Sequence, residues 1–163
     1  MAEQRRSAII TGAAQGIGLA TAQNLAAAGT DLCLVDNNAD ALEQVARAIA
    51  SNDAQVIHRV ADVTKRSDVE GFVTAAQETF GRVDALANIA GGAGPRNLHQ
   101  IDEFEDEDWD LVIALNLRST FLACRAVIPI MRAQNYGRIV NMSSSVARGR
   151  TGPVGTAGGR LAY

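Results

Sequence analysis

The strongest constraint on the fold is a glycine-rich turn near the N-terminus, placed between an apolar run and a helical pattern. Residues 7–18 read SAIITGAAQGIG, with glycines at G-x-x-x-G-x-G spacing. This order is typical of a strand, a tight turn and a helix N-terminus that together hold a pyrophosphate. Gly12 permits a turn conformation that a side chain disfavours, Gly16 lets the backbone approach phosphate oxygens, and Gly18 lets the helix pack closely. Free N–H groups and the helix dipole supply the attraction.

The elements that follow the glycines strengthen this interpretation. An apolar-periodic segment, 17–28, predicts a helix that stops at Gly29, and a second apolar run, 32–35, leads into Asp36. A carboxylate at the tip of the second strand, roughly 20 residues past the glycines, is where a dinucleotide fold binds the adenosine ribose hydroxyls. The alternative is that Asp36 is a turn residue or the N-cap of the next helix.

Length, charge and composition exclude several classes of protein. The 163 residues suit a single α/β domain, and 47% hydrophobic with 20% charged residues is ordinary for a soluble globular protein. A net charge of −3 provides no basic surface for nucleic acid or an anionic membrane. No apolar run approaches the ~20 residues that a membrane span requires. Cys33 and Cys124 lack metal-ligand spacing, which favours reduced thiols in a cytoplasmic protein.

Acidic residues are concentrated in one stretch, 102–110, where seven of nine residues are Asp or Glu. One interpretation is a site for a cation or a basic substrate. We favour the solvated first turn of a long helix, because acidic side chains are stabilised at the positive end of the helix dipole. His58 and His99 have no partner pattern, so we predict no metal site.

Strand and helix patterns alternate along the whole chain, with no repeat and no low-complexity linker. Strands are expected near 7–11, 31–35, 55–60, 84–88 and 137–142, and helices near 16–28, 38–51, 66–80 and 108–134. The strands are nearly continuous apolar runs, as expected where helices cover both faces of a parallel sheet. We therefore predict an α/β fold with a doubly wound parallel sheet in one domain, 1–163. Ligands of such sheets lie outside the carboxyl ends of the strands.

The residues at these strand ends resemble the short-chain dehydrogenase/reductase family. That family is marked by TGxxxGIG, an Asp-Val after the third strand, Asn-Asn-Ala-Gly after the fourth, an Asn in the long helix, a Ser after the fifth strand and Tyr-x-x-x-Lys. This chain has Thr11 to Gly18, Asp62-Val63, Asn88-Ile89-Ala90-Gly91, Asn116, Ser144 and Tyr163. The resemblance implies the N-terminal five strands of a Rossmann fold, an NAD cofactor and a secondary alcohol or ketone substrate. It also implies a homo-oligomer, a dimer or tetramer, because relatives pair the long helix across an interface.

The resemblance assigns cofactor binding to Gly12, Gln15, Gly16, Ile17, Gly18, Asp36, Asp62, Val63, Asn88, Ala90 and Gly91. In this assignment Asp62 accepts a hydrogen bond from the adenine amino group, and Val63 supplies its backbone N–H. The alternative for Asp62 is a helix N-terminal residue, and both roles can hold at once. Asn88 ties the fourth strand to its neighbours, and Gly91 lets the nicotinamide ribose approach. Their alternative is a plain strand-to-loop turn. Ile89 stands where the family usually has a second Asn.

The sequence also predicts NAD rather than NADP as the cofactor. Asp36 is placed beside the ribose, where a 2′-phosphate would meet a like charge. Neither Gln15 nor Asn37 offers the basic residue that NADP-preferring relatives use.

Asn116 lies in the middle of a helix that is apolar almost all round. An amide in that setting must find partners or cost a few kcal/mol. In the family this Asn holds a water that relays protons to a catalytic lysine. The alternative is a core Asn that is bonded within its own helix.

Ser144 and Tyr163 complete the catalytic assignment that the resemblance implies. Ser144 would polarise the substrate carbonyl, with Ser145 as a possible substitute, and Tyr163 would transfer the proton of the alcohol. The family's lysine four residues after the tyrosine has no counterpart here, and Lys65 is the only lysine in the sequence. We therefore expect the C-terminal part of the family fold to be missing and the 163-residue chain to have little activity. The alternative is a catalytically silent dinucleotide-binding or interaction module.

Overall fold

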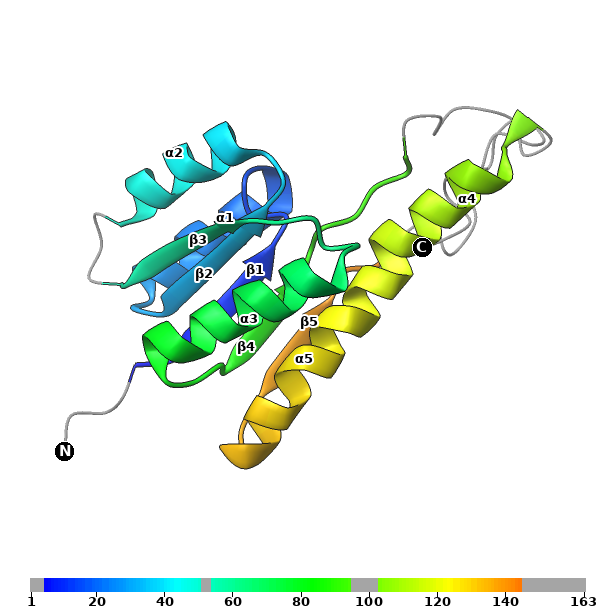
Figure 1. Ribbon diagram of the computed structural model, residues 1–163. Helices are drawn as coiled ribbons and strands as arrows, with labels where there is room; N and C mark the ends of the chain where they lie inside the picture. The colour runs from blue at the N-terminus through cyan, green and yellow to red at the C-terminus, as the bar shows by residue number, and fades with distance from the viewer. Residues whose placement is uncertain (1–4, 51–53, 95–102, 145–163) are drawn as a thin grey trace.

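Five parallel strands form one sheet at the centre of the molecule (Figure 1). The computed structural model describes residues 5–50, 54–94 and 103–144. The strand order is β3-β2-β1-β4-β5, and the strands are β1 (Ser7–Thr11), β2 (Asp31–Asp36), β3 (Val56–Val60), β4 (Ala85–Asn88) and β5 (Arg138–Asn141). Each expected strand is present with its ends shifted by at most one residue. The predicted α/β class and doubly wound parallel sheet are confirmed.

The order of the strands reverses at β1. Thr11 at the end of β1 pairs with Val35 of β2 on one side and with Asn88 of β4 on the other. The chain builds outward to β3 first and then returns to the opposite side of β1 for β4 and β5. A crevice therefore opens between the carboxyl ends of β1 and β4, the position where ligands bind in such sheets.

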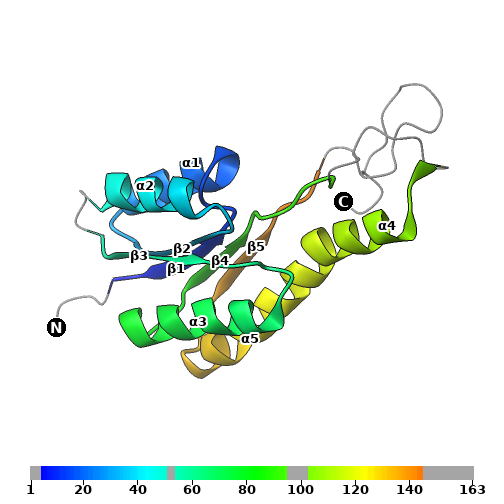
Figure 2. The same ribbon diagram turned by 45° about the horizontal axis from the view of Figure 1, so that its top comes forward.

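Helices cover both faces of the sheet, as the apolar strands predict. The helices α1 (Gly16–Ala27) and α2 (Ala39–Ile49) lie on one face, and α3 (Arg66–Phe80) lies on the other with the long helix that follows β4 (Figure 2). Alternate strand residues face opposite layers. Ile10, Leu32, Leu34, Leu42 and Ala22 share one core cluster, and Ile9, Val35, Leu86, Phe72 and Val127 share the other.

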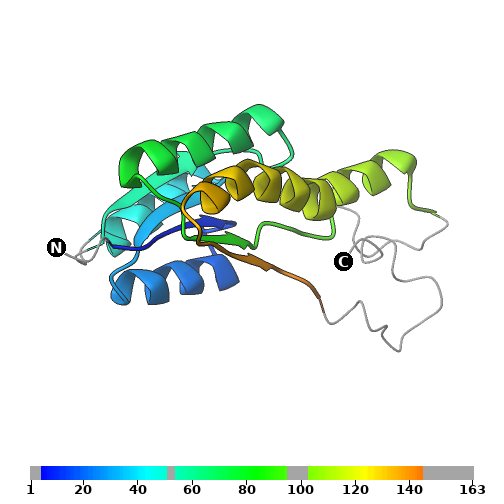
Figure 3. The same ribbon diagram turned by 90° about the horizontal axis from the view of Figure 1, so that it is seen from below.

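The long helix has three consecutive parts: α4 (Asp106–Ile113), a π-helical turn η2 (Ala114–Arg118) and α5 (Ser119–Ala133). Seen from below, it lies on the same side of the sheet as α3 and extends past the end of the sheet (Figure 3). The first turn of α4 contains Asp106, Glu107 and Asp108, so the acidic stretch does begin a helix. Within the described ranges, no cluster of His, Cys, Asp or Glu could hold a metal ion.

By length and composition alone, Asp106–Ala133 could cross a membrane, because its mean hydropathy reaches 1.6 over 18 residues. This differs from the expectation that no apolar segment is long enough, since scattered polar residues lower the mean only slightly. The inward face of the helix packs on the sheet, where Leu122, Val127 and Met131 belong to the same buried cluster as Leu86. Burial against the sheet accounts for the apolar character of that face.

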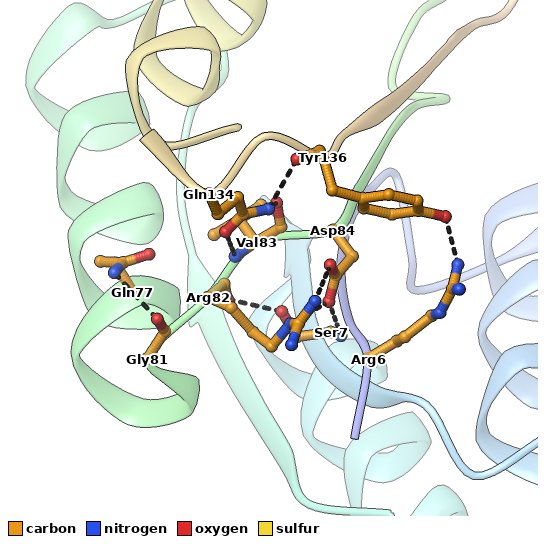
Figure 4. A network of polar contacts seen from close by, with 9 residues as sticks. All are labelled: Arg6, Ser7, Gln77, Gly81, Arg82, Val83, Asp84, Gln134 and Tyr136. Atoms are coloured by element: carbon orange, nitrogen blue, oxygen red, sulfur yellow. Dashed lines mark hydrogen bonds and ion pairs between the residues drawn. The ribbon is translucent and has the colours of Figure 1, made fainter. Parts of the chain in front are cut away.

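A network of polar side chains closes the opposite end of the sheet from the crevice (Figure 4). Asp84 is buried, and its carboxylate accepts two hydrogen bonds of 2.6 Å from the Arg82 guanidinium. It also accepts the backbone N–H of Ser7 at 2.9 Å, while the Ser7 hydroxyl donates to the Arg82 carbonyl. Gln134 adds bonds to the backbone of Val83 and Tyr136. These bonds join the entry to β1 with the entries to β4 and β5.

The Asp84 network should make folding stability sensitive to acid. Burial alone would raise the pKa of Asp84, but the hydrogen bonds from Arg82 and Ser7 outweigh burial and hold the pKa below its usual value. The stabilisation is complete above the unfolded pKa of about 3.9 and is lost as pH falls through the lower folded pKa. We expect Asp84→Asn to lower the free energy of unfolding at pH 7 and to flatten its fall below about pH 4.

Urea unfolding at a series of pH values measures this effect. Glu78→Gln, an exposed change on α3, serves as the control for the altered net charge. Equal acid dependence in the wild type and Asp84→Asn would contradict the assignment.

Candidate functional site

A cleft of about 370 Å³ lies at the carboxyl ends of the strands. The residues that line it come from the turns after β1, β2, β3 and β4, from the long helix and from the segment after β5: Gly12, Gln15, Gly16, Ile17, Gly18, Asp36, Asn37, Ala61, Asp62, Val63, Ile89, Ala90, Gly91, Leu115 and Met142. Every residue predicted to bind the cofactor lines this cleft except Asn88. The cleft thus joins residues that lie far apart in the sequence.

The glycines of the first turn are required by the geometry around them. Gly12 has a φ of +68°, and a Cβ there would lie 2.9 Å from the Ala90 backbone nitrogen. A Cβ on Gly18 would lie 1.9 Å from the Gly12 carbonyl oxygen, so α1 could not approach β1 as it does. Gly16 has a φ of +54° and faces open space with no protein atom within 4 Å of that position. An extended ligand can therefore approach the backbone at Gly16.

The N-terminus of α1 differs from the other helix starts. It has no acidic residue in its first turn, and Gln15 forms no capping hydrogen bond with its side chain. By contrast, α2 begins with the capping Asn38, and α3 has Asp68 in its first turn. The first N–H groups of α1 thus remain available, at the positive end of the helix dipole. This arrangement suits a phosphate group bound in the cleft, which is what a pyrophosphate-containing cofactor supplies.

Asp36 organises the turn beside this helix. One carboxylate oxygen accepts the backbone N–H of Ala14 at 3.0 Å, and the other accepts that of Asn38 at 3.0 Å. Asn38, and not Asp36, is the N-cap of α2, where its side chain accepts the N–H of Ala41. Asp36 is therefore a turn residue that also faces the cleft. Each carboxylate oxygen can accept more than one hydrogen bond, so Asp36 can still accept hydrogen bonds from a ligand in the cleft.

Asp62 forms the turn that precedes α3. Its carboxylate accepts hydrogen bonds from the hydroxyl and the backbone N–H of Thr64, at 2.7 and 3.0 Å. The ammonium of Lys65 lies 3.5 Å from the same carboxylate. The hydrogen bond from the Thr64 hydroxyl lowers the pKa of Asp62 below its usual value. Burial acts in the opposite direction, and the charge of Lys65 lowers the pKa further. Asp62 is thus a charged acceptor that shapes the turn before α3 and lines the cleft. Its contact with adenine stays a prediction.

Asn88 ties β4 to the elements beside it. Its amide nitrogen donates to the Asn141 side-chain oxygen on β5 at 2.9 Å and lies 3.6 Å from the Cys124 sulfur on α5. Asn88 is buried and lies behind the cleft wall, which explains its absence from the lining. The predicted tie between the fourth strand and its neighbours is therefore present.

Asn116 lies in the π-helical turn and contacts the loop after β4. Its side-chain oxygen accepts the N–H of Gly92 at 2.9 Å, and its amide nitrogen donates to the Gly92 carbonyl at 2.8 Å. A third bond of 2.9 Å runs to the Val112 carbonyl within the helix. A Cβ on Gly91 would lie 2.6 Å from the Asn116 oxygen, so this contact requires a glycine. The side chain therefore bonds both within its helix and outside it.

The remaining catalytic candidates lie near or beyond the end of the described chain. Ser144 is half-buried and follows the last residue of β5, Asn141, by three positions. Ser145 and Tyr163 lie outside the described residues.

Thr11 is a site residue that the sequence reasoning did not single out. Its hydroxyl oxygen accepts the backbone N–H groups of both Ile89 and Ala90 at 3.1 Å. These two bonds hold the loop after β4 against the end of β1. The available signal was the threonine directly before the first glycine of the motif. Leu115, Met142 and Asn37 also line the cleft and were not predicted.

We expect Thr11→Val to destabilise the fold while keeping the side-chain volume. Two backbone N–H groups would lose their acceptor, which costs about 1–3 kcal/mol for each group that stays unsatisfied. Thermal and urea unfolding measure the loss. Thr21→Val removes an exposed hydroxyl that donates to its own helix, and it should change stability by less than about 0.5 kcal/mol. Equal effects of the two variants would rule out the role given to Thr11.

Comparison with known proteins identifies a family and relatives that match most of this chain. The family model for short chain dehydrogenase matches residues 6–157. Levodione reductase of Leifsonia aquatica is 42% identical over 141 residues, which are 85% of this chain and 52% of that protein. D-beta-hydroxybutyrate dehydrogenase of Rhizobium meliloti is 37% identical over 142 residues, 86% of this chain and 54% of the relative. The chain spans about half the length of the curated relatives it matches.

Solved structures share the same arrangement of strands and helices. The crystal structure of levodione reductase matches with a TM-score of 0.85 at 39% identity and covers 94% of this chain and 58% of that chain. The structure of NAD+-bound xylitol dehydrogenase matches with a TM-score of 0.85 at 34% identity and the same coverage. The predicted Rossmann fold is confirmed by these matches.

Proposed function

The chain belongs to the short-chain dehydrogenase family of oxidoreductases, and on this premise we propose that it binds NAD and serves the interconversion of a secondary alcohol and its ketone. One observation carries the proposal. The uncapped N-terminus of α1 and the carboxylate of Asp36 line the same cleft, and they suit the two polar parts of an adenosine diphosphate. The named relatives support the reaction class, and a neighbour solved with NAD+ supports the cofactor.

The lining residues divide the cleft into three parts. The turn with Gly12 and Gly16, together with the first N–H groups of α1, would bind the pyrophosphate. Asp36 would accept the adenosine ribose hydroxyls, and Asp62 with Val63 would contact the adenine. Gln15, Ile17 and Gly18 form the wall of α1 in this arrangement. Ala90 and Gly91, held in place from behind by Asn88, would contact the nicotinamide ribose. When bound, the nicotinamide would donate or accept the hydride.

The protein's own task would be the movement of the proton. Ser144 would donate a hydrogen bond to the substrate oxygen, and Tyr163 would transfer the proton. A tyrosine with a pKa of about 10 is only about one part in a thousand phenolate at pH 7, so it needs a cationic neighbour. Lys65 lies 3.5 Å from Asp62 at the adenine end and does not suit that role. Asn116 would hold a water in the proton path.

We further propose that the protein assembles as a dimer or tetramer in the cytoplasm. The long helix exposes large apolar residues, including Trp109, Leu117 and Phe121, at 43%, 62% and 57% of their surface. Exposed apolar residues that lie together are a common feature of interfaces. Cys33 and Cys124 are both free thiols, as expected in a reducing compartment.

The test of this function is an assay of the whole gene product with NAD+ and a panel of secondary alcohols. General acid–base groups contribute about 10²- to 10⁴-fold to rates, so Tyr163→Phe and Ser144→Ala should each reduce kcat by at least about 10²-fold. Ser145→Ala is the matched control and should retain most activity. A loss of activity in Ser145→Ala but not in Ser144→Ala would indicate that Ser145 donates the hydrogen bond to the substrate oxygen. Cofactor binding without turnover would instead support a catalytically silent module.

NADH should bind more tightly than NADPH. A 2′-phosphate would bring a negative charge beside Asp36, and each unit pair at ~4 Å costs about 4 kcal/mol at an effective dielectric of ~20, before relaxation. Fluorescence titration with both reduced cofactors measures the preference. Asp36→Asn should bring the Kd values for NADH and NADPH closer together, because the side chain keeps its size while the negative charge is lost. NADPH binding at least as tight as that of NADH in the wild type would refute the preference.

A further inference from the structure

The π-helical turn in the long helix changes the hydrogen bonding of the backbone. The N–H of Ser119 bonds to the carbonyl of Ala114, five residues earlier. In a regular α-helix the same N–H would bond to Leu115, four residues earlier. The N–H of Ser119 is therefore directed to Ala114 and away from the Leu115 carbonyl, at this point of a helix that packs on the sheet.

The Ser119 side chain donates to the Leu115 carbonyl in place of its own backbone N–H. Its hydroxyl donates to the Leu115 carbonyl at 2.5 Å, and the residue is only 5% exposed. The hydroxyl of the next residue, Thr120, donates to the Asn116 carbonyl at 2.9 Å. Two consecutive hydroxyls thus bond to the two carbonyls at the centre of the turn.

The two residues whose carbonyls are held in this way are those that reach the cleft. Leu115 lines the cleft, and its side chain lies 3.7 Å from the position of a Cβ on Gly92. Asn116 makes two hydrogen bonds to the backbone of Gly92 and contacts Gly91. The geometry of the π turn therefore determines where the loop after β4 lies.

We propose that Ser119 is a positioning residue of the cofactor site. Its hydroxyl stabilises the π turn that directs the Asn116 amide onto Gly92, and it thereby fixes the loop on which the nicotinamide half of the cofactor rests. This inference rests on the proposed function for the identity of the ligand. The placement of the loop is independent of that function.

A hydroxyl that bonds to its own helix is not sufficient for this role. Thr79 in α3 donates to the Ala75 carbonyl at 2.7 Å. That carbonyl lies in a regular α-helix, where a backbone N–H already bonds to it, so the hydroxyl adds little. Thr79 is half-buried like Thr120, which makes the two threonines a matched pair for isosteric removal of the hydroxyl.

The experiment compares Ser119→Ala and Thr120→Val with Thr79→Val in the whole gene product. Hydrogen exchange of a peptide that contains Gly92 reports directly on the bond from its N–H to Asn116. Fluorescence titration gives the Kd for NADH, and competition with AMP gives the affinity of the adenosine half alone. We expect Ser119→Ala to accelerate exchange at Gly92 and to weaken NADH about tenfold, while AMP affinity stays within about twofold of the wild type. Thr79→Val should change none of the three.

Two further variants separate hydrogen bonding from packing and folding. Ser119→Thr keeps the hydroxyl and should exchange at Gly92 like the wild type. In an Asn116→Ala background, Ser119→Ala should accelerate exchange no further, because both changes break the same connection. Additive effects would overturn the proposal. So would wild-type exchange in Ser119→Ala, equal losses in Ser119→Ala and Ser119→Thr, or parallel weakening of NADH and AMP. A wild type that fails to bind NADH would refute the proposed function, and the exchange data would still decide the role of Ser119.

Discussion

The contact between the turn after β1 and the loop after β4 determines the shape of the whole cleft. The Thr11 hydroxyl accepts two backbone N–H groups from this loop, and Gly12 leaves no space for a side chain between the two segments. From this junction the loop continues to Gly92, where Asn116 holds it from the other side. The cleft therefore has one wall fixed at both ends, and α1 with its uncapped N-terminus forms the opposite wall.

Much of the fold could be predicted because its signals are local. The buried strands β1 and β2 are nearly continuous apolar runs, and all five strands were predicted with their ends within one residue. The glycines of the first turn were found because positive φ and close backbone approach leave few alternatives to glycine. Asp36 and Asp62 were recognisable as polar residues placed directly after such strands. The carboxylate of Asp62 shapes the turn before α3 and also lines the cleft, and its contact with adenine stays a prediction.

The features that were missed depend on contacts between distant segments. The two backbone N–H groups that bond to the Thr11 hydroxyl lie 78 and 79 residues further along the chain, so no local pattern predicts this contact. The π turn requires one extra residue within an otherwise regular apolar pattern, so periodicity does not locate it. The sequence could not give the partners of the Asn116 side chain, because only one of its three hydrogen bonds lies within its own helix. The long helix has the length and hydropathy of a membrane-spanning segment, and only its packing on the sheet explains the apolar residues of its inward face.

Because the strand order reverses at β1, the two sides of the cleft come from different segments of the sequence. Asp36 and Asp62, the two carboxylates that line the cleft, follow β2 and β3 on one side of β1. The loop held by Asn116, and Ser144 beyond β5, lie on the other side. Under the proposed function, substitutions at Asp36 are expected to change the preference for the cofactor. Substitutions at Asn116 or Ser144 are expected to change the reacting end. We expect these two properties to respond to different substitutions, because the central strand β1 lies between the two groups of residues.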